Sequence, residues 1–196
     1  YDAFYPENPV MLSEPSQIRG VDVVMIGITP FQYNPVTREL IVYRDLKVEI
    51  VIEGGSGKVG DDRLRSRFWD PIVKGTVINP DVIPEITWQT NHTGSRTSDY
   101  EYIIITPDSS IFLQWADSIK VWRTLQGIST GVVTTTEIGG NTYTAIKSYI
   151  DNAYLTWDVP PVAVLLLGDY STGTNGIDSY LYTHPAGYPN FASDNY

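Results

Sequence analysis

The sequence predicts a chain of two parts: an antiparallel, β-sandwich-like portion, followed by a partial α/β domain with a mostly parallel sheet. Residues 21–52 contain short β-branched runs, whereas residues 100–167 alternate continuous apolar runs with amphipathic helical stripes. The chain has 196 residues, of which 42% are hydrophobic and 18% charged. This composition is enough to bury a core and excludes global disorder.

Three runs in the first part are expected to form strands: 21–28, 40–44 and 46–52. The third run alternates apolar and polar side chains, which is typical of a half-buried antiparallel strand. Asn34-Pro35 lies between the first two runs and begins a turn that lets the chain reverse. Residues 61–69 are expected to form a helical turn that packs Phe68 and Trp69 on the sheet.

Three arginines in this segment, Arg63, Arg65 and Arg67, have two interpretations. They could plug a pocket for basic residues, or form a solvated basic face beside Asp61 and Asp62.

A linker is predicted at residues 79–99, because proline, glycine, asparagine and serine recur there. It separates residues 1–78 from residues 100–196. An exposed segment of this kind is accessible to proteolytic cleavage.

The second part is expected to follow the order β-α-β-α-β. Its strands are predicted at 100–107, 132–136 and 162–167, and its helices at 112–127 and 141–154. The first helix carries an apolar stripe that we expect to face the core: Phe112, Trp115, Ala116, Ile119 and Trp122. This order predicts parallel strands with right-handed connections.

Ligand sites in such sheets lie beyond the carboxyl ends of the strands. The ends predicted here are Thr106-Pro107, Thr136-Glu137 and Gly168-Asp169. We therefore expect these residues to share one edge and any chemistry to lie there.

Charge and hydropathy exclude some partners. The net charge of −10 argues against nucleic acid, because proteins that bind it present a basic face. The first 98 residues contribute −3 of this charge and the remaining residues −7. No apolar run approaches the roughly 20 residues that a membrane-spanning helix needs, so no membrane-spanning segment is expected.

The sequence contains no cysteine, which excludes a thiol nucleophile and a thiolate metal site from these residues. The two histidines, His92 and His184, lack the spacing of a helical metal pair. His184 precedes a proline and is expected to be a loop residue. We therefore expect no self-contained histidine-based catalytic triad in this chain.

Several stretches of the chain resemble the gingipain-type cysteine endopeptidases of the caspase-like clan. Arg19-Gly20 and residues 30–37, which include Gln-Tyr-Asn-Pro-Val-Thr, resemble the end of the propeptide in that family. Residues 102–107, 165–169 and 193–196 resemble the opening of its catalytic domain. The similarity follows the family's order over nearly the whole chain.

The resemblance implies a proform fragment, or zymogen fragment, of a secreted or cell-surface bacterial protease. The first half would be the end of an assisting and inhibitory β-sandwich propeptide, in intramolecular contact with a caspase-like catalytic domain. In the family a cysteine thiolate attacks the peptide bond and a histidine handles the proton. Both follow the matched residues, so the resemblance implies that this chain contains no catalytic residue and is inactive alone. Its substrates are expected to be polypeptides cut after Arg or Lys, which an acidic catalytic half attracts.

The resemblance also implies site residues. Cleavage after a basic residue at the junction indicates Arg96 and Thr97 as the processing site, with an ordinary solvated arginine as the alternative. The candidates at the active edge are Gly168, Asp169, Ser193 and Asp194. Because the family is stabilised by calcium, Asp169 and Asp194 are also candidate ligands of a structural calcium ion, although Gly-Asp after a strand is a common turn. No cofactor is expected for the chemistry itself.

Two other functions stay open. One is a non-catalytic surface or secretion-assembly protein that keeps the scaffold and lacks the dyad. The other is a carbohydrate-binding module joined to an α/β domain, for which Trp69, Trp88 and Trp157 are the tryptophans without an expected core role.

Overall fold

The chain is described from a computed structural model, which covers residues 2–51, 57–86, 99–171, 173, 175–182 and 191–193. It divides into two compact units, Tyr1–Thr87 and Trp88–Tyr196. Each unit is described by itself.

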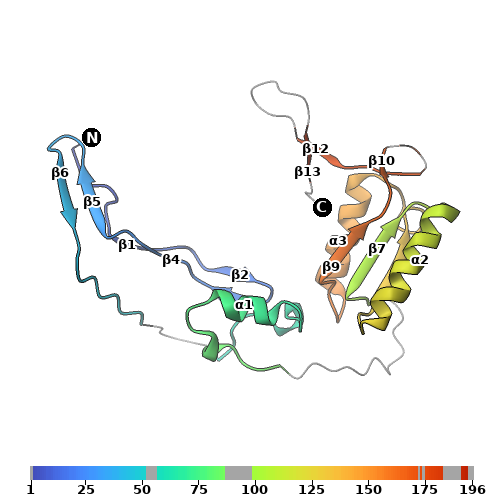
Figure 1. The fold of residues 1–196 in the computed structure, drawn as a ribbon, viewed down its shortest axis with the longest axis horizontal. Coiled ribbons are helices and arrows are strands. Elements are labelled where there is room, and N and C mark those ends of the chain that lie inside the picture. Colours follow the sequence, from blue (N-terminus) through green and yellow to red (C-terminus); the bar gives the residue numbers. More distant parts are fainter. Residues whose placement is uncertain are drawn as a thin grey trace. The chain divides into compact units, whose positions relative to one another are not determined.

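Short antiparallel pairs of strands lie between residues 10 and 42 of the N-terminal unit (Figure 1). The strands are β1 (Val10–Leu12), β2 (Ser16–Ile18), β3 (Val21–Val23), β4 (Ile26–Ile28), β5 (Phe31–Asn34) and β6 (Glu39–Val42). β1 pairs with β4, β2 with β3 and β5 with β6. The antiparallel prediction is confirmed. Each of these sheets has two strands, however, so a sandwich of larger sheets is not seen among the described residues.

Two of the predicted strands differ from those observed. Residues 21–28 form two strands, because β3 pairs with β2 while β4 pairs with β1. The described part of 46–52 is not a strand. Alternation shows which faces an extended segment presents, but a strand also needs a neighbour for its backbone hydrogen bonds.

A two-residue turn closes the β2–β3 hairpin. Arg19 and Gly20 have φ angles of 47° and 80°, the positive values that a type I′ turn requires. The tip of the hairpin is held by the segment that follows residue 57. Asp22 N donates to Val59 O at 3.1 Å, and Asp61 N donates to Gly20 O at 2.9 Å. We refer to residues 59–86 as the hairpin clamp.

The hairpin clamp supplies most of the core of the N-terminal unit. It contains η1 (Asp62–Leu64), α1 (Asp70–Thr76) and η2 (Pro80–Val82). Val73 of α1 and Ile83 after η2 are buried together with Val21 of β3. η1 confirms a helical turn within residues 61–69, but Phe68 is 38% exposed, so the expectation that it packs on the sheet is wrong. The helix α1 was not predicted. The residues that open the predicted linker thus pack in this unit.

Arg65 corrects the expectation of a solvated basic face, since its side chain is 2% exposed. Its Nε and Nη2 donate to the Asp70 carboxylate at 2.9 and 2.6 Å, and Nη2 also donates to Pro84 O at 2.8 Å. The hydrogen bond to Asp70 raises the pKa of the Arg65 guanidinium above its ordinary value. Asp70 belongs to the unpredicted helix α1, which is why the buried partner was missed.

The C-terminal unit begins with the predicted β-α-β-α-β order. Its elements are β7 (Tyr102–Thr106), α2 (Ser110–Leu125), β8 (Thr130–Thr134), α3 (Tyr143–Thr156) and β9 (Ala163–Leu166). The strands are parallel, in the order β8-β7-β9. The continuous apolar run of β7 is typical of a strand that is covered on both faces, and β7 is the central strand of this sheet.

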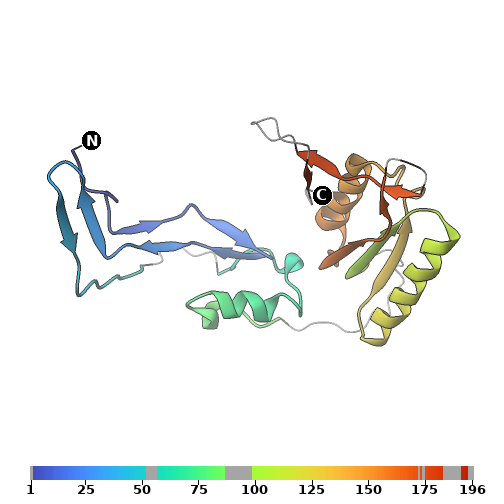
Figure 2. The same ribbon diagram turned by 45° about the horizontal axis from the view of Figure 1, so that its top comes forward.

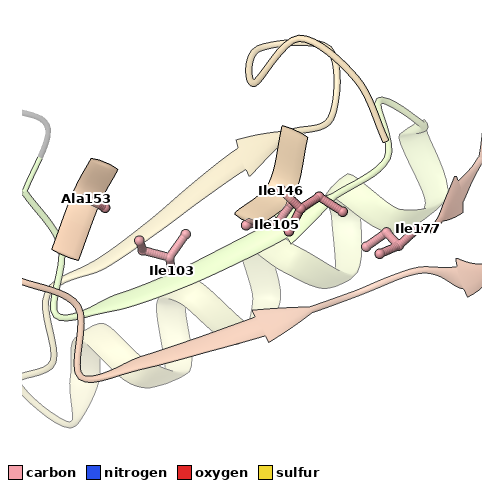
Figure 3. Packing of buried hydrophobic residues seen from close by; sticks show 5 residues of the cluster. All are labelled: Ile103, Ile105, Ile146, Ala153 and Ile177. Carbon is pink, nitrogen blue, oxygen red and sulfur yellow. The ribbon is translucent and has the colours of Figure 1, made fainter. Parts of the chain in front are cut away.

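The helices α2 and α3 lie on opposite faces of this sheet (Figures 1 and 2). On the face under α3, Ile103 and Ile105 of β7 are buried against Ile146 and Ala153 of α3 and against Ile177 (Figure 3). Ile104 alternates to the other face, where α2 packs on β7 and β8. The strand β7 therefore contributes buried side chains to the packing on both faces of the sheet.

The tryptophans depart from their predicted roles. Trp115 and Trp122 are each 62% exposed, so the expectation that they face the core is wrong. α2 buries Ala116 instead, and both tryptophans lie to one side of that stripe. Trp157 packs edge-to-face on Tyr100 and Tyr149, with ring centroids 6.1 and 6.2 Å away.

Trp69, in the N-terminal unit, lies 4.6 Å below the Arg19 guanidinium. A carbohydrate platform that needs Trp69 and Trp157 free loses support from these contacts. Trp88 lies outside the described residues.

Four short strands follow β9 and were not predicted. They are β10 (Asp169–Tyr170), β11 (Gly176–Ile177), β12 (Tyr180–Tyr182) and β13 (Phe191–Ser193). β10 pairs with β11 in parallel, and β12 with β13 in antiparallel fashion. Among the described residues, no helix has the length and apolar character needed to cross a membrane.

Candidate active-site edge

The carboxyl ends of the three parallel strands are joined by hydrogen bonds at one edge of the sheet. Thr106, at the end of β7, is fully buried. Its carbonyl accepts from Thr135 N at 2.8 Å, and its hydroxyl donates to Leu167 O at 3.0 Å. The predicted common edge of the strand ends is therefore present, with Thr106 bridging the segments after β8 and β9.

Gly168 lies where the chain leaves β9, at a position with little room for a side chain. A Cβ at this position would lie 3.0 Å from Ile177 Cγ1 and 3.1 Å from Pro107 Cδ, tighter than ordinary van der Waals contact. Glycine thus lets the post-β9 segment lie close to the end of β7, while Ile177 anchors that segment in the core. Asp169 follows in β10 as an exposed residue paired with Gly176 through the backbone.

The other two candidates for this edge are placed less fully. Ser193 is the last residue of β13 and pairs with Tyr180 of β12. Asp194 lies outside the described residues, as do Arg96, Thr97, His92 and His184. The structure therefore brings Gly168 and Asp169 to the edge and leaves the processing site untested.

Calcium binding stays a prediction. The described residues contain no group of three or more His, Cys, Asp or Glu side chains that could hold a metal ion. Calcium takes six to eight oxygen ligands, and exposed Asp169 alone does not provide such a set. No step below depends on a metal ion.

A residue that sequence reasoning missed connects two loops at this edge. The side-chain amide of Asn141, just before α3, donates to Gly173 O at 2.8 Å and to Gly176 O at 3.2 Å. Its backbone carbonyl accepts from Asp178 N at 3.0 Å. The turn before it was recognisable from Gly139-Gly140, whose φ angles are 89° and 151°, but its partners more than thirty residues away were not.

Glu137 orders the loop between β8 and α3. Its carboxylate accepts from Thr134 N at 2.7 Å and from the Thr134 hydroxyl at 3.0 Å. Together with Asn141, it fixes the approach from β8 to α3. The edge thus offers ordered loops, carboxylates and exposed backbone, which can bind and orient a polypeptide, while the chain has no thiol to attack one.

Comparison with known proteins agrees with the division of the chain into two units, Tyr1–Thr87 and Trp88–Tyr196. The family model Propeptide_C25 matches residues 1–79, and the model of peptidase family C25 matches residues 95–196. Gingipain R2 of Porphyromonas gingivalis, from each of two strains, is 25% identical over 173 residues, which is 86% of this chain and 22% of the relative. The chain therefore spans about a fifth of the length of these relatives. No solved structure matches it.

The family model of the peptidase covers more than half of the chain and begins just before β7. The propeptide model covers the strand pairs and most of the hairpin clamp. The chain thus belongs to peptidase family C25, as a gingipain-type propeptide segment followed by the start of the catalytic domain.

Proposed function

We propose that this chain is the proform segment of a secreted or surface-bound bacterial cysteine endopeptidase. The observation that carries the proposal is that the two family models match separate units in propeptide-then-enzyme order. A propeptide ahead of its enzyme implies intramolecular contact between the two. Thiol-dependent hydrolysis of polypeptides by the longer protein tests the proposal directly.

In this proposal the matched residues bind and orient the substrate, and the cysteine and histidine come from the remainder of the protein. The thiolate attacks the scissile carbonyl and forms an acyl-enzyme, which water then hydrolyses. The role of the present residues is to provide the ordered edge built on Thr106, Glu137 and Asn141. Without a thiol these 196 residues alone are inactive.

Charge supports a preference for basic substrates. The second half of the chain carries 3 Lys and Arg against 10 Asp and Glu, a net charge of −7. Such a surface attracts cationic peptides over a distance of about one Debye length, roughly 8 Å at physiological salt. We therefore propose cleavage after Arg or Lys, and expect the preference to weaken as salt is raised.

Replacing Arg96 with glutamine in the longer protein is expected to block maturation. Cleavage after Arg96 needs a cation that glutamine lacks, so the precursor should persist where the unmodified protein yields a new N-terminus at Thr97. Lys58→Gln, which removes a cation from the N-terminal unit, is the control and should mature normally. Immunoblotting and N-terminal sequencing provide the measurement.

The same samples test the proposed contact between the units. After cleavage, residues 1–96 should co-elute with the catalytic part in size-exclusion chromatography at micromolar concentration. A mature N-terminus far from Thr97 would contradict the processing site, and separate elution of the two parts would contradict the contact.

A further inference from the structure

Asn141 forms three hydrogen bonds with residues that lie more than thirty positions further along the chain. Its amide nitrogen donates two hydrogen bonds, to Gly173 O at 2.8 Å and Gly176 O at 3.2 Å. The backbone carbonyl oxygen of Asn141 accepts a third hydrogen bond, from Asp178 N at 3.0 Å. The carbonyl oxygens of Gly173 and Gly176 can only accept hydrogen bonds, so both require a donor, which is the side-chain NH2 group of Asn141.

The segment that Asn141 holds is anchored at one end and open at the other. Gly176 and Ile177 are buried, and Ile177 belongs to the core under α3. Ser171, Gly173 and Asn175 are exposed. Gly176 N also donates to Gly173 O at 2.9 Å, so the Gly173 carbonyl accepts two hydrogen bonds, one from Gly176 and one from the Asn141 amide.

Asn141 lies next to the capped start of helix α3. The next residue, Thr142, caps α3 by accepting a hydrogen bond from Ala145 N at 3.3 Å. α3 packs on the sheet through buried Ile146 and Ala153. Asn141 therefore ties an exposed loop at the carboxyl edge to the fixed start of a core helix.

We propose that Asn141 is a positioning residue, which holds Gly173 and residues 175–178 in the arrangement in which they bind the polypeptide substrate. The inference rests on the proposed function, since it concerns the same edge of the sheet. Loops at this edge bind ligands in parallel α/β sheets, and preformed loops lose less entropy on binding. Asn141 acts through the loop and does not touch the reacting atoms, so it affects the binding of substrate rather than the chemical step.

The test compares Asn141→Asp with unmodified longer protein in peptide hydrolysis. The aspartate carboxylate has nearly the same shape as the amide but cannot donate a hydrogen bond. It would be repelled by the carbonyl oxygens of Gly173 and Gly176, so both hydrogen bonds would be lost. We expect KM to rise about tenfold, which corresponds to about 1.4 kcal/mol, and kcat to stay within about twofold. Asn152→Asp, the same change at an exposed position of α3, is the matched control and should leave both constants unchanged.

A second measurement separates this proposal from the peptidase proposal. In the 196-residue chain, Asn141→Asp should reduce amide exchange protection at residues 176–178 about tenfold, and Asn152→Asp should not. Unchanged protection and unchanged KM in Asn141→Asp would overturn the positioning role, as would a loss of kcat with KM unaltered. An unmodified longer protein without activity would refute the peptidase proposal, and with it the substrate-binding role, even if the exchange result held.

Discussion

Replacing Asp70 with alanine is expected to lower the free energy of unfolding of the N-terminal unit by about 3 kcal/mol. The Arg65 side chain is 2% exposed, and two of its hydrogen bonds end on the Asp70 carboxylate. Removing one partner of a buried ion pair leaves the other charge without compensation, which costs about 3–5 kcal/mol in comparable cases. Urea unfolding, followed by the fluorescence of Trp69, provides the measurement.

The matched control is Asp62→Ala, which removes a second carboxylate from the same guanidinium. Asp62 lies 3.4 Å from Arg65 Nη1, but its side chain is 81% exposed. Water screens and replaces this interaction, so a loss below about 1 kcal/mol is expected. Equal effects of the two substitutions would mean that burial of the Arg65–Asp70 pair does not control the stability of the hairpin clamp.

Replacing Gly20 with alanine is expected to destabilise the same unit by about 3 kcal/mol. Gly20 has a φ angle of 80°, where a side chain costs roughly 1–2 kcal/mol. A Cβ there would also lie closer to the Asp61 carbonyl oxygen than van der Waals contact permits, so backbone must move. Overpacking of this kind adds about 1–3 kcal/mol. The same urea titration measures the combined effect.

Gly57→Ala separates the two causes. Gly57 has a φ angle of 75°, but no atom of the described residues lies within 4 Å of a Cβ built on it. Only the conformational cost applies, so a loss of about 1 kcal/mol is expected. If both variants lose the same stability, the close approach between the hairpin tip and the clamp contributes nothing.

The C-terminal unit was largely predictable because its signals are local. β7 and β9 are short, largely apolar runs, and β8 contains the β-branched run that begins at Val132. The alternation of these strands with helices predicts that they are parallel, as they are in the sheet β8-β7-β9. The common edge of the strand ends follows from that topology. The exposure of Trp115 and Trp122 did not follow, because helical periodicity defines a stripe but not which side of it the sheet covers.

The N-terminal unit was harder to predict because its structure depends on distant partners. The Arg19-Gly20 turn pairs β2 with β3, and the same reversal of the chain brings β4 beside β1. The periodicity of apolar residues shows that a segment is extended, but it does not show which strand will be its partner. The Arg65–Asp70–Pro84 contact and the bonds of Asn141 join segments that only the folded chain brings together. Arg96, the predicted processing site, lies in residues that the structure does not describe.

One measurement tests the central claim most directly: hydrolysis of Arg- and Lys-ended peptides by the longer protein, with and without a thiol-alkylating reagent. We expect hydrolysis that requires removal of the propeptide and that alkylation abolishes, and no hydrolysis by the 196-residue chain, which contains no cysteine. Hydrolysis that survives complete alkylation would contradict the cysteine mechanism. A processed protein without activity on any peptide would favour a non-catalytic surface or assembly role for this scaffold.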